Sequence, residues 1–363
     1  MGSLHIGLSV VATDVGGGFS IGLGGLGFTM GIAGSWMLLT GLIGAWISAV
    51  LLIPVVSRLA RKQQFLTFPQ LFEHYYSKRV ALLAGLISAI GYAGFTSSQI
   101  LAGAKLAAAT FTGLDLNMAL IVMGVIAVVY TVMGGLKAVI YTDTVQWIIL
   151  MSGLIFIGIP LGYLAVGGFS EIKATVAPEF LQFTNVSWQE LLKWAVTIIP
   201  IWFVGMTLYQ RIYAAKDTRT AKRAWFIAGL FEYPVMAFMG VALGLMARVA
   251  LQQGMFASEG YTTLAGLDPE MGLPMFLKTV LPVGLMGIMM SAYFSAIMST
   301  ADSCLMASSG NVVTDIIHAF RKEGSNKQTL RLSQLVTLTI GVLALLLAMK
   351  MQNVLELMLY SYA

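Results

Sequence analysis

Three hydroxyls and a carboxylate lie within one strongly apolar stretch in the second half of the chain. Ser299, Thr300, Asp302 and Ser303 belong to a segment hydrophobic enough to cross a bilayer. Polar groups are costly in hydrocarbon, so they face a protein interior or a water-filled path and usually mark an ion or substrate route. Ala296, Ser299 and Thr300 have the i, i+3, i+4 spacing of one helix face. The alternative is that these hydroxyls only donate to carbonyls of their own helix.

A second polar interruption lies near the N-terminus, where Thr13, Asp14 and the run Gly16-Gly17-Gly18 break another apolar segment. Secondary transporters use such a broken helix, facing a second helix, to build a sodium site at the membrane midplane. Sodium is a hard cation that takes carbonyl and hydroxyl oxygens as ligands. Asp14 either caps the second half-helix or contributes to the cation or substrate site. The two segments together predict a cation-coupled solute carrier.

The composition indicates an integral membrane protein. Of the 363 residues, 58% are hydrophobic and only 10% are charged, whereas soluble domains are about a quarter charged. The net charge of +5 does not indicate nucleic-acid binding, because the basic residues are confined to a few loops. His5, His74 and His318 are too isolated to form a metal site, and no nucleophile–base pair has catalytic spacing. We therefore expect a protein that is not an enzyme.

Hydropathy predicts the elements that must position these residues. With about 20 apolar residues per crossing, nine spans are expected, near residues 4–29, 31–56, 80–110, 116–135, 143–167, 190–208, 223–251, 280–314 and 330–351. Most Lys and Arg residues lie in loops 57–79, 209–223 and 317–331, which share one side if nine spans alternate. The positive-inside rule makes that side cytoplasmic. The opposite loops carry Asp115, Glu171, Glu179, Glu190, Glu259, Asp268 and Glu270. We expect a multi-pass protein of the plasma membrane.

Three motifs resemble those of the sodium:solute symporter family. Residues 134–146, GGLKAVIYTDTVQ, resemble its GGLxAVxxTDxxQ stretch, and residues 210–217, QRIYAAKD, resemble the QRxxAAKD segment after its sixth core helix. Residues 298–303, with Ala307-Ser308-Ser309 and Thr314-Asp315 after them, are similar to its eighth core helix. The motifs occur in the family's order, and the resemblance covers essentially the whole chain.

This resemblance implies an all-α integral membrane fold of the leucine-transporter-like type, with five helices followed by five of inverted topology. Residues 4–167 would form the first repeat, with core helices 1–5. Residues 190–363 would form the second repeat, with core helices 6–9. We expect the first and last helices of the usual family set to be absent, because no helix precedes the first repeat and the sequence stops at residue 363, before a tenth core helix. The chain is therefore expected to be either a fragment or a truncated product.

The resemblance also assigns ion-binding residues. The sodium ligands would be the carbonyls of Ala12, Val15 and Ala296 and the hydroxyls of Ser299 and Thr300. Some relatives bind a second sodium with an acid at the position of Asp143 and two hydroxyls of core helix 8, which correspond here to Asp302 and Ser303. Asp143 is alternatively a helix N-cap. If Asp143 and Asp302 approach each other, we expect the pair to share a proton or to bind a second cation.

The solute would lie between the broken first helix and core helices 2, 3, 6 and 7. Candidate substrate-binding or gating residues are Asp14, Phe19, Ser35, Thr96, Gln99, Trp202 and Glu232. Trp202 would be an aromatic lid over the substrate or, alternatively, an anchor at the lipid interface. Sugar-transporting members of the family carry a lysine near the position of Glu232. Glu232 could therefore favour an amine, a quaternary ammonium or a hydroxyl-rich solute, or it could form a buried ion pair with Lys105.

The function implied is symport of sodium and a small organic solute by alternating access. The expected partners are the co-transported sodium ion, the solute and the lipid bilayer, with no nucleic acid, and the chain is expected to act as a monomer. Two alternatives stay open, a membrane sensor domain of a signalling protein and a proton-coupled permease of related fold. The sequence names neither the solute nor the number of sodium ions.

Overall fold

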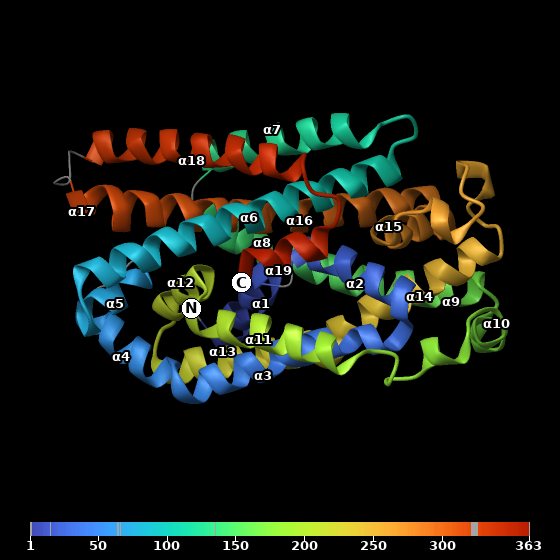
Figure 1. The fold of residues 1–363 in the computed structure, drawn as a ribbon, viewed down its shortest axis with the longest axis horizontal. Coiled ribbons are helices and arrows are strands. Elements are labelled where there is room, and N and C mark those ends of the chain that lie inside the picture. The colour runs from blue at the N-terminus through green and yellow to red at the C-terminus, as the bar shows by residue number, and fades with distance from the viewer. Residues whose placement is uncertain are drawn as a thin grey trace.

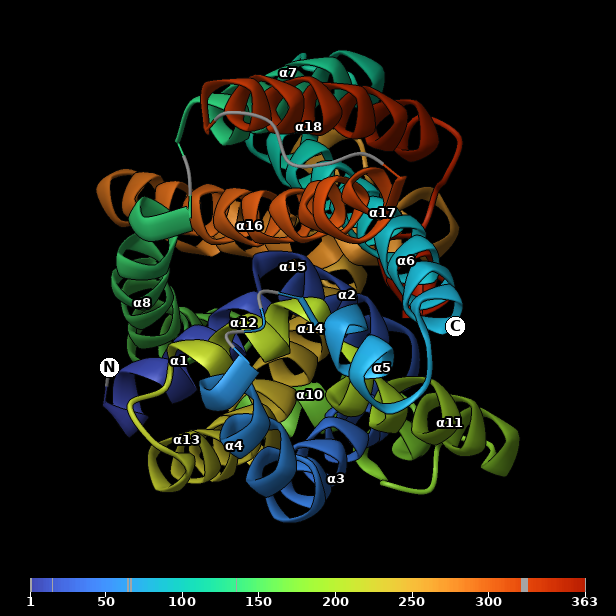
Figure 2. The same ribbon diagram turned by 90° about the vertical axis from the view of Figure 1, so that its left-hand side faces the viewer.

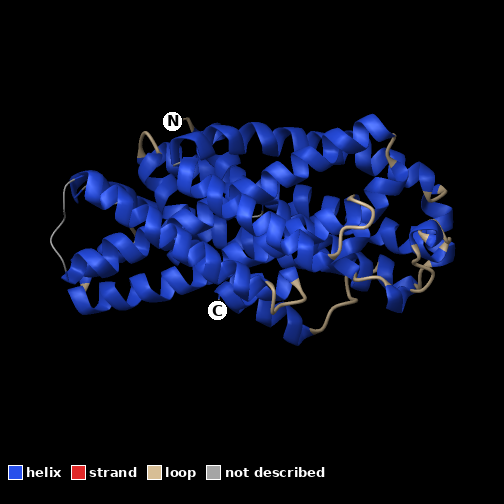
Figure 3. Cartoon of the chain, turned by 90° about the horizontal axis from the view of Figure 1, so that it is seen from above, coloured by secondary structure: helices blue, strands red, loops and turns tan. Residues whose placement is uncertain are grey.

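The computed structural model describes residues 2–14, 16–63, 65, 67–134, 136–320 and 326–362. Helices and short helical turns are the regular elements of this part of the chain, and no strand occurs in it (Figure 3). The helices are α1 (Ser3–Asp14), α2 (Gly16–Met30), α3 (Trp36–Leu51), α4 (Ile53–Gln63), α5 (Pro69–Tyr75), α6 (Lys78–Thr110), α7 (Leu116–Gly134), α8 (Leu136–Gly153), α9 (Ile159–Ala165), α10 (Gly168–Thr175), α11 (Trp188–Val204), α12 (Met206–Ala214), α13 (Thr218–Leu230), α14 (Ala237–Gln252), α15 (Pro269–Val280), α16 (Val283–Asn311), α17 (His318–Phe320), α18 (Asn326–Ala348) and α19 (Val354–Tyr362).

The helices form stacked layers. Figures 1 and 2 show α7 and α18 along one outer side, with α6 and α16 crossing beneath them. On the other side of α16 lie α1 and α2, and the layer of α3, α11, α13 and α14 follows. The segments predicted to carry chemistry, α1 and α16, therefore meet in the interior of the molecule.

Seven helical segments of the described part are long and apolar enough to cross a membrane, or eight if the bent pair α11–α12 counts as one. The sequence predicts nine spans. The difference lies near residue 30, where the sequence predicts two separate spans and the structural count has one segment, Ser20–Leu51. That segment turns back at the short helical turn η1 (Gly31–Ser35), and Figure 1 shows α2 and α3 running in opposite directions on either side of it. Gly31 has a φ of +72° at this reversal, a conformation that favours glycine.

The predicted span 190–208 is not one continuous helix. It ends as α11 at Val204, and α12 begins at Met206 after a bend of 41°. Gly205, between them, has an extended backbone (φ −66°, ψ 115°). Pro200 inside α11 and Gly205 are the local signals for this break. The helix α19 was also not among the nine predicted spans.

Close helix packing in the interior depends on glycine. A Cβ on Gly244 of α14 would overlap the carbonyl oxygen of Gly24 in α2, and a Cβ on Gly27 would overlap the backbone of Val241. Small residues let the backbones of membrane helices approach in this way. The contact fixes α2 against α14 and so places α1, which precedes it, beside α16.

Charge is distributed unevenly between the two ends of the molecule. The basic segments around α4–α5 and α12–α13 lie at one end, on the left of Figure 1. The acidic segments around α10 and α15 lie at the other end. The arrangement agrees with the predicted alternation of loops, and which end is cytoplasmic stays a prediction.

Candidate functional site

Three oxygens converge where α1 meets α16. The Thr300 hydroxyl lies 3.2 Å from the carbonyl oxygen of Ala12 and 3.0 Å from that of Ala296. Thr300 is 1% exposed, so the contact is shielded from solvent. The bond to Ala296 is the ordinary bond of a helical threonine to its own helix, but the approach to Ala12 joins residues 288 positions apart in sequence. Carbonyl and hydroxyl oxygens arranged in this way suit a hard cation such as sodium.

The other predicted sodium ligands are placed as follows. Ser299 precedes Thr300 and faces a cavity of about 300 Å³ between α7, α8 and α16. This cavity, called here the α8/α16 cavity, is lined by Ile126, Tyr130, Gln146, Phe294, Ser295, Met298, Ser299 and Asp302. Val15 lies outside the described residues. Ala12, Ala296 and Thr300 are thus brought together, with Ser299 beside them at the cavity wall.

The residues predicted for a second cation site have different neighbours. Asp302 is fully buried, and its Oδ1 lies 2.5 Å from the hydroxyl of Thr131 in α7. Ser303, also fully buried, accepts a hydrogen bond of 3.4 Å from Nη2 of Arg211 in α12. The side chain of Asp143 lies outside the described part of the chain. The contacts therefore direct Asp302 toward α7 and Ser303 toward α12.

Arg211 is a residue that sequence reasoning missed. It was counted among the basic residues of loop 209–223, but it lies in α12 and is only 3% exposed. Its Nη2 donates to the hydroxyl of Thr13 at 2.5 Å, and its Nη1 donates to the carbonyl of Thr207 at 3.1 Å. With its bond to Ser303, the guanidinium joins α1, α12 and α16 beside the oxygen cluster. The position of Arg211 at the end of a predicted span was the available signal.

Lys105 and Glu232 do not pair, which corrects one of the alternatives for Glu232. Lys105 binds Asp268 and Glu270 instead, with Nζ–oxygen distances of 2.6 and 2.5 Å. Glu232 is 1% exposed at the π-helical turn η4 (Phe231–Met236), and its carboxylate lies against Gly41 of α3. The two residues belong to different parts of the helix packing, which hydropathy alone does not resolve.

The remaining predicted solute residues are buried within the helix packing. Trp202 is fully buried against Gly44 and the ring of Trp225, 6.3 Å between centroids. Ser35 and Thr96 donate to carbonyls of their own helical segments, and Gln99 Nε2 lies 3.4 Å from Ser98. The side chains of Asp14 and Phe19 lie outside what the structure describes. The described members of this group, including Glu232, line neither the α8/α16 cavity nor the cavity described next.

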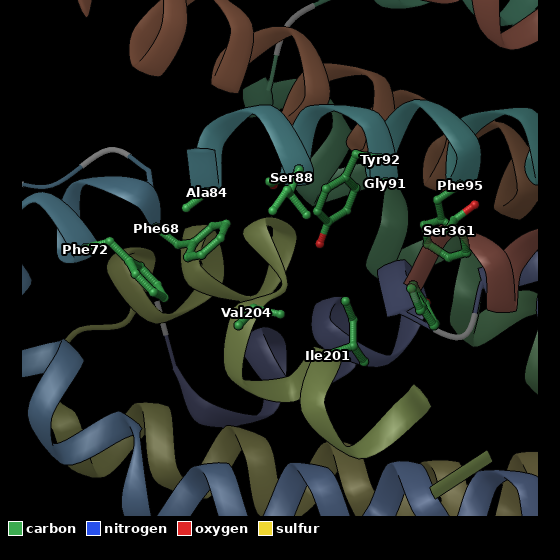
Figure 4. Close-up of a pocket in the computed structure, with 12 residues that line it drawn as sticks. Phe68, Phe72, Ala84, Ser88, Gly91, Tyr92, Phe95, Ile201, Val204 and Ser361 are labelled. Atoms are coloured by element: carbon green, nitrogen blue, oxygen red, sulfur yellow. The ribbon is translucent and has the colours of Figure 1, made fainter. Parts of the chain in front are cut away.

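A cavity of about 250 Å³ lies between α5, α6, α11 and α19 (Figure 4). This α6/α19 cavity is lined by Phe68, Phe72, Ala84, Ile87, Ser88, Gly91, Tyr92, Phe95, Ile201, Val204, Ser361 and Tyr362. Its lining residues are uncharged. Tyr92 connects the cavity to the helix break, because its hydroxyl accepts from the Thr207 amide at 3.1 Å and lies 3.0 Å from the Thr207 hydroxyl. Aromatic rings and a few hydroxyls can hold a small solute that has an apolar body.

Comparison with known proteins agrees with this architecture. A model of the sodium:solute symporter family matches residues 1–363. The osmoregulated proline transporter OpuE of Bacillus subtilis is 28% identical over 385 residues, which cover 100% of this chain and 73% of that protein. Sodium/glucose cotransporter 1 of Oryctolagus cuniculus is 27% identical over 361 residues, covering 89% of this chain and 53% of its own length.

A solved structure of a Na⁺-coupled sialic acid symporter, in a substrate-bound, outward-open state, has a similar fold. The TM-score is 0.77 at 22% sequence identity, and the match covers 96% of this chain and 74% of the other. The predicted all-helical, leucine-transporter-like fold and the family resemblance are confirmed. The division into repeats at residues 4–167 and 190–363 stays a prediction, as do the roles of the site residues.

Proposed function

This chain belongs to the sodium:solute symporter family, and on that basis we propose that it moves a small organic solute across the cytoplasmic membrane together with sodium. Its curated relatives include transporters of proline and of glucose. The proposed mechanism is alternating access, in which one central site opens to the two sides of the membrane in turn. The basic end of the molecule would face the cytoplasm, and one chain would act alone.

The observation that carries the proposal is the contact of Thr300 with the Ala12 carbonyl. A sodium ion there would be held by the carbonyls of Ala12, Val15 and Ala296 and by the hydroxyls of Ser299 and Thr300. The ion would bridge α1 and α16, replacing the direct hydrogen bond of the hydroxyl by ion–oxygen contacts on both helices. Its departure would loosen α1 from α16. Sodium and solute must then increase each other's affinity by the same factor, because coupling between two binding sites is reciprocal.

We place the solute in the α6/α19 cavity, next to the break between α11 and α12. The cavity volume of about 250 Å³ is slightly below the usual range of about 300–1,000 Å³ for ligand pockets, which favours a small solute. Phe68, Phe72, Tyr92 and Phe95 supply apolar contact, and the hydroxyl of Ser88 supplies a polar one. An uncharged or zwitterionic solute fits this lining better than one with a net charge.

A second cation at Asp143, Asp302 and Ser303 is a separate part of the proposal. The buried carboxylate of Asp302 supports it, because a buried negative charge requires a cation or a proton nearby. The guanidinium of Arg211, 3.4 Å from Ser303, supplies a competing positive charge. If Asp302→Asn leaves both the sodium-to-solute stoichiometry and the pH dependence of uptake unchanged, the second site is wrong.

Uptake of radiolabelled solutes into proteoliposomes tests the function. We expect accumulation that requires an inward sodium gradient and that falls about 2–30-fold, at limiting sodium, in Ser299→Ala and Thr300→Ala. Ser309→Ala is the matched control, because that buried hydroxyl of α16 donates to a carbonyl of its own helix, that of Met306, at 3.3 Å. Uptake driven by a proton gradient without sodium would select a proton-coupled permease. Solute binding without uptake would favour a sensor.

A further inference from the structure

A buried lysine and two carboxylates meet where α6, α15 and α19 come together. The side chain of Lys105 is 1% exposed, and its Nζ lies 2.6 Å from Asp268 Oδ2 and 2.5 Å from Glu270 Oε2. The Glu270 side chain is also buried, at 4% exposure. Charges are kept at such depth only when they are paired, because an unpaired buried charge is costly. Lys105 therefore ties α6 to the beginning of α15.

Glu270 has a second set of partners, the first amides of α19. Its Oε2 accepts from the Val354 amide at 2.8 Å, and its Oε1 accepts from the Leu355 amide at 2.9 Å. The first amides of a helix have no partner inside the helix. A carboxylate there satisfies them and complements the helix dipole. Both oxygens of Glu270 are thus engaged, and one side chain connects the ion pair to the beginning of α19.

The other end of α19 forms part of the α6/α19 cavity. Ser361 and Tyr362 line it, and the Tyr362 ring lies 5.1 Å from that of Phe95 in α6. α19 has nine residues, and helices shorter than about 12 residues are marginal without tertiary support. Figure 1 shows α19 between α6 and the α1–α2 layer. Displacement of the first turn of such a short helix moves the cavity wall at its other end.

We propose that Glu270 is a positioning residue for the solute cavity. It fastens α19 to α6 and α15, so that Ser361 and Tyr362 keep their places at the cavity wall. Glu270 acts through α19 and does not contact the solute. The role needs a carboxylate with two accepting oxygens, because an ion pair with Lys105 alone would leave the α19 amides without acceptors. The inference rests on the proposed function, since it takes the α6/α19 cavity to be the solute site.

The test combines hydrogen–deuterium exchange with transport, on the full chain in lipid nanodiscs and proteoliposomes. In Glu270→Gln, we expect the amides of residues 354–359 to exchange at least about tenfold faster, since hydrogen bonds to a charged acceptor are lost. We expect the solute KM to rise severalfold while the sodium activation curve and Vmax stay close to those of the parent. Glu259→Gln is the matched control, because Glu259 forms a more exposed ion pair with Lys278 at the same end of the molecule, at 3.0 Å.

Two further variants separate a helix cap from a simple ion pair. The double variant Lys105→Glu/Glu270→Lys restores opposite charges but gives the α19 amides an ammonium, which cannot accept hydrogen bonds. We expect it to keep the fast exchange and the raised KM, and parent-like values would overturn the proposal. Asn353→Ala removes the side-chain hydrogen bond of 3.0 Å to the Glu356 amide and leaves the buried charges intact. We expect it to raise the exchange rate of the α19 amides and the solute KM less than Glu270→Gln does.

The exchange measurement stands apart from transport. Unchanged exchange in Glu270→Gln would overturn the cap, and faster exchange with an unchanged solute KM would overturn the positioning role. If the parent transports no solute, the proposed function fails while the exchange data still decide whether Glu270 holds α19.

Discussion

Replacing Thr300 by valine removes one hydroxyl from the contact between α1 and α16 and keeps the shape of the side chain. In the absence of sodium the substitution should lower the free energy of unfolding by only about 1 kcal/mol, because one hydroxyl proton is shared between the carbonyls of Ala12 and Ala296. With sodium bound, the variant lacks one charged contact, worth about 1.5–3 kcal/mol. Because the variant also lacks the hydrogen bond of about 1 kcal/mol in the absence of sodium, the net loss of binding free energy is about 0.5–2 kcal/mol, and we expect sodium to bind about 2–30-fold more weakly. Thr300→Ser, which keeps the hydroxyl, should bind sodium nearly as well as the parent.

The assay is the shift of the thermal unfolding midpoint on adding sodium, which requires no knowledge of the solute. At 100 times its dissociation constant, sodium stabilises the parent by about 2.7 kcal/mol, and a 30-fold weaker site would leave about 0.9 kcal/mol. The shift should therefore be smaller in Thr300→Val and persist in full in Thr300→Ser, with potassium as the control cation. A full sodium shift in Thr300→Val would refute the assignment of this hydroxyl as a sodium ligand.

Two other predictions concern the surroundings of the site. Arg211→Gln should lower the free energy of unfolding by about 2–4 kcal/mol, because buried acceptors lose their donor. Arg211→Lys should recover only part of this free energy, because an ammonium lacks the forked geometry of a guanidinium. Chemical denaturation measures both variants, and an unchanged free energy of unfolding in Arg211→Gln would contradict the buried contacts. Gly244→Ala should destabilise the protein by about 1–3 kcal/mol through overlap with the Gly24 carbonyl. Gly284→Ala, with no atom within 4 Å of the added Cβ, should leave the stability unchanged or raise it by up to about 1 kcal/mol. Equal unfolding midpoints for the two variants would contradict the close packing of α2 on α14.

The meeting of α1 and α16 was predictable from the sequence. Glycines beside Asp14 favour a helix end, and hydroxyls within an apolar helix favour burial against protein. The structure brings Thr300 to the Ala12 carbonyl, and Val15 lies outside the described residues. The pairing of the two segments could be inferred because glycines beside an acid and clustered hydroxyls are both rare within apolar segments. The family resemblance then indicates that these two segments contact each other.

The partners of individual buried charges were not predictable in the same way. Hydropathy gives the extent of a span but neither its rotation nor the neighbours of a given face. Lys105 was therefore matched with Glu232, the other charge within a span, although its partners are Asp268 and Glu270 beside α15. Trp202, expected as a lid over the solute or as an anchor at the lipid interface, packs on Gly44 and Trp225, and its role stays a prediction. The cavity lining at α5 and α19 was missed because it depends on tertiary contacts of short helices.

Two charges that the sequence assigned to loops are buried against partners on other helices. Arg211 donates to the hydroxyls of Thr13 in α1 and Ser303 in α16, and Glu270 accepts from the first amides of α19. The first amides of a helix inside an apolar protein must find acceptors, and the Glu270 carboxylate supplies them.

A charge at the edge of a predicted span should therefore be weighed as a buried partner for a neighbouring helix before it is counted as a loop charge. Leaving Arg211 out of the count of basic residues in the predicted cytoplasmic loops does not change the predicted orientation. Lys216, Arg219 and Arg223 of the same segment are exposed, and the positive-inside argument rests on basic residues at the surface. Removing Glu270 from the opposite side has no effect either, because acidic residues contribute little to that rule.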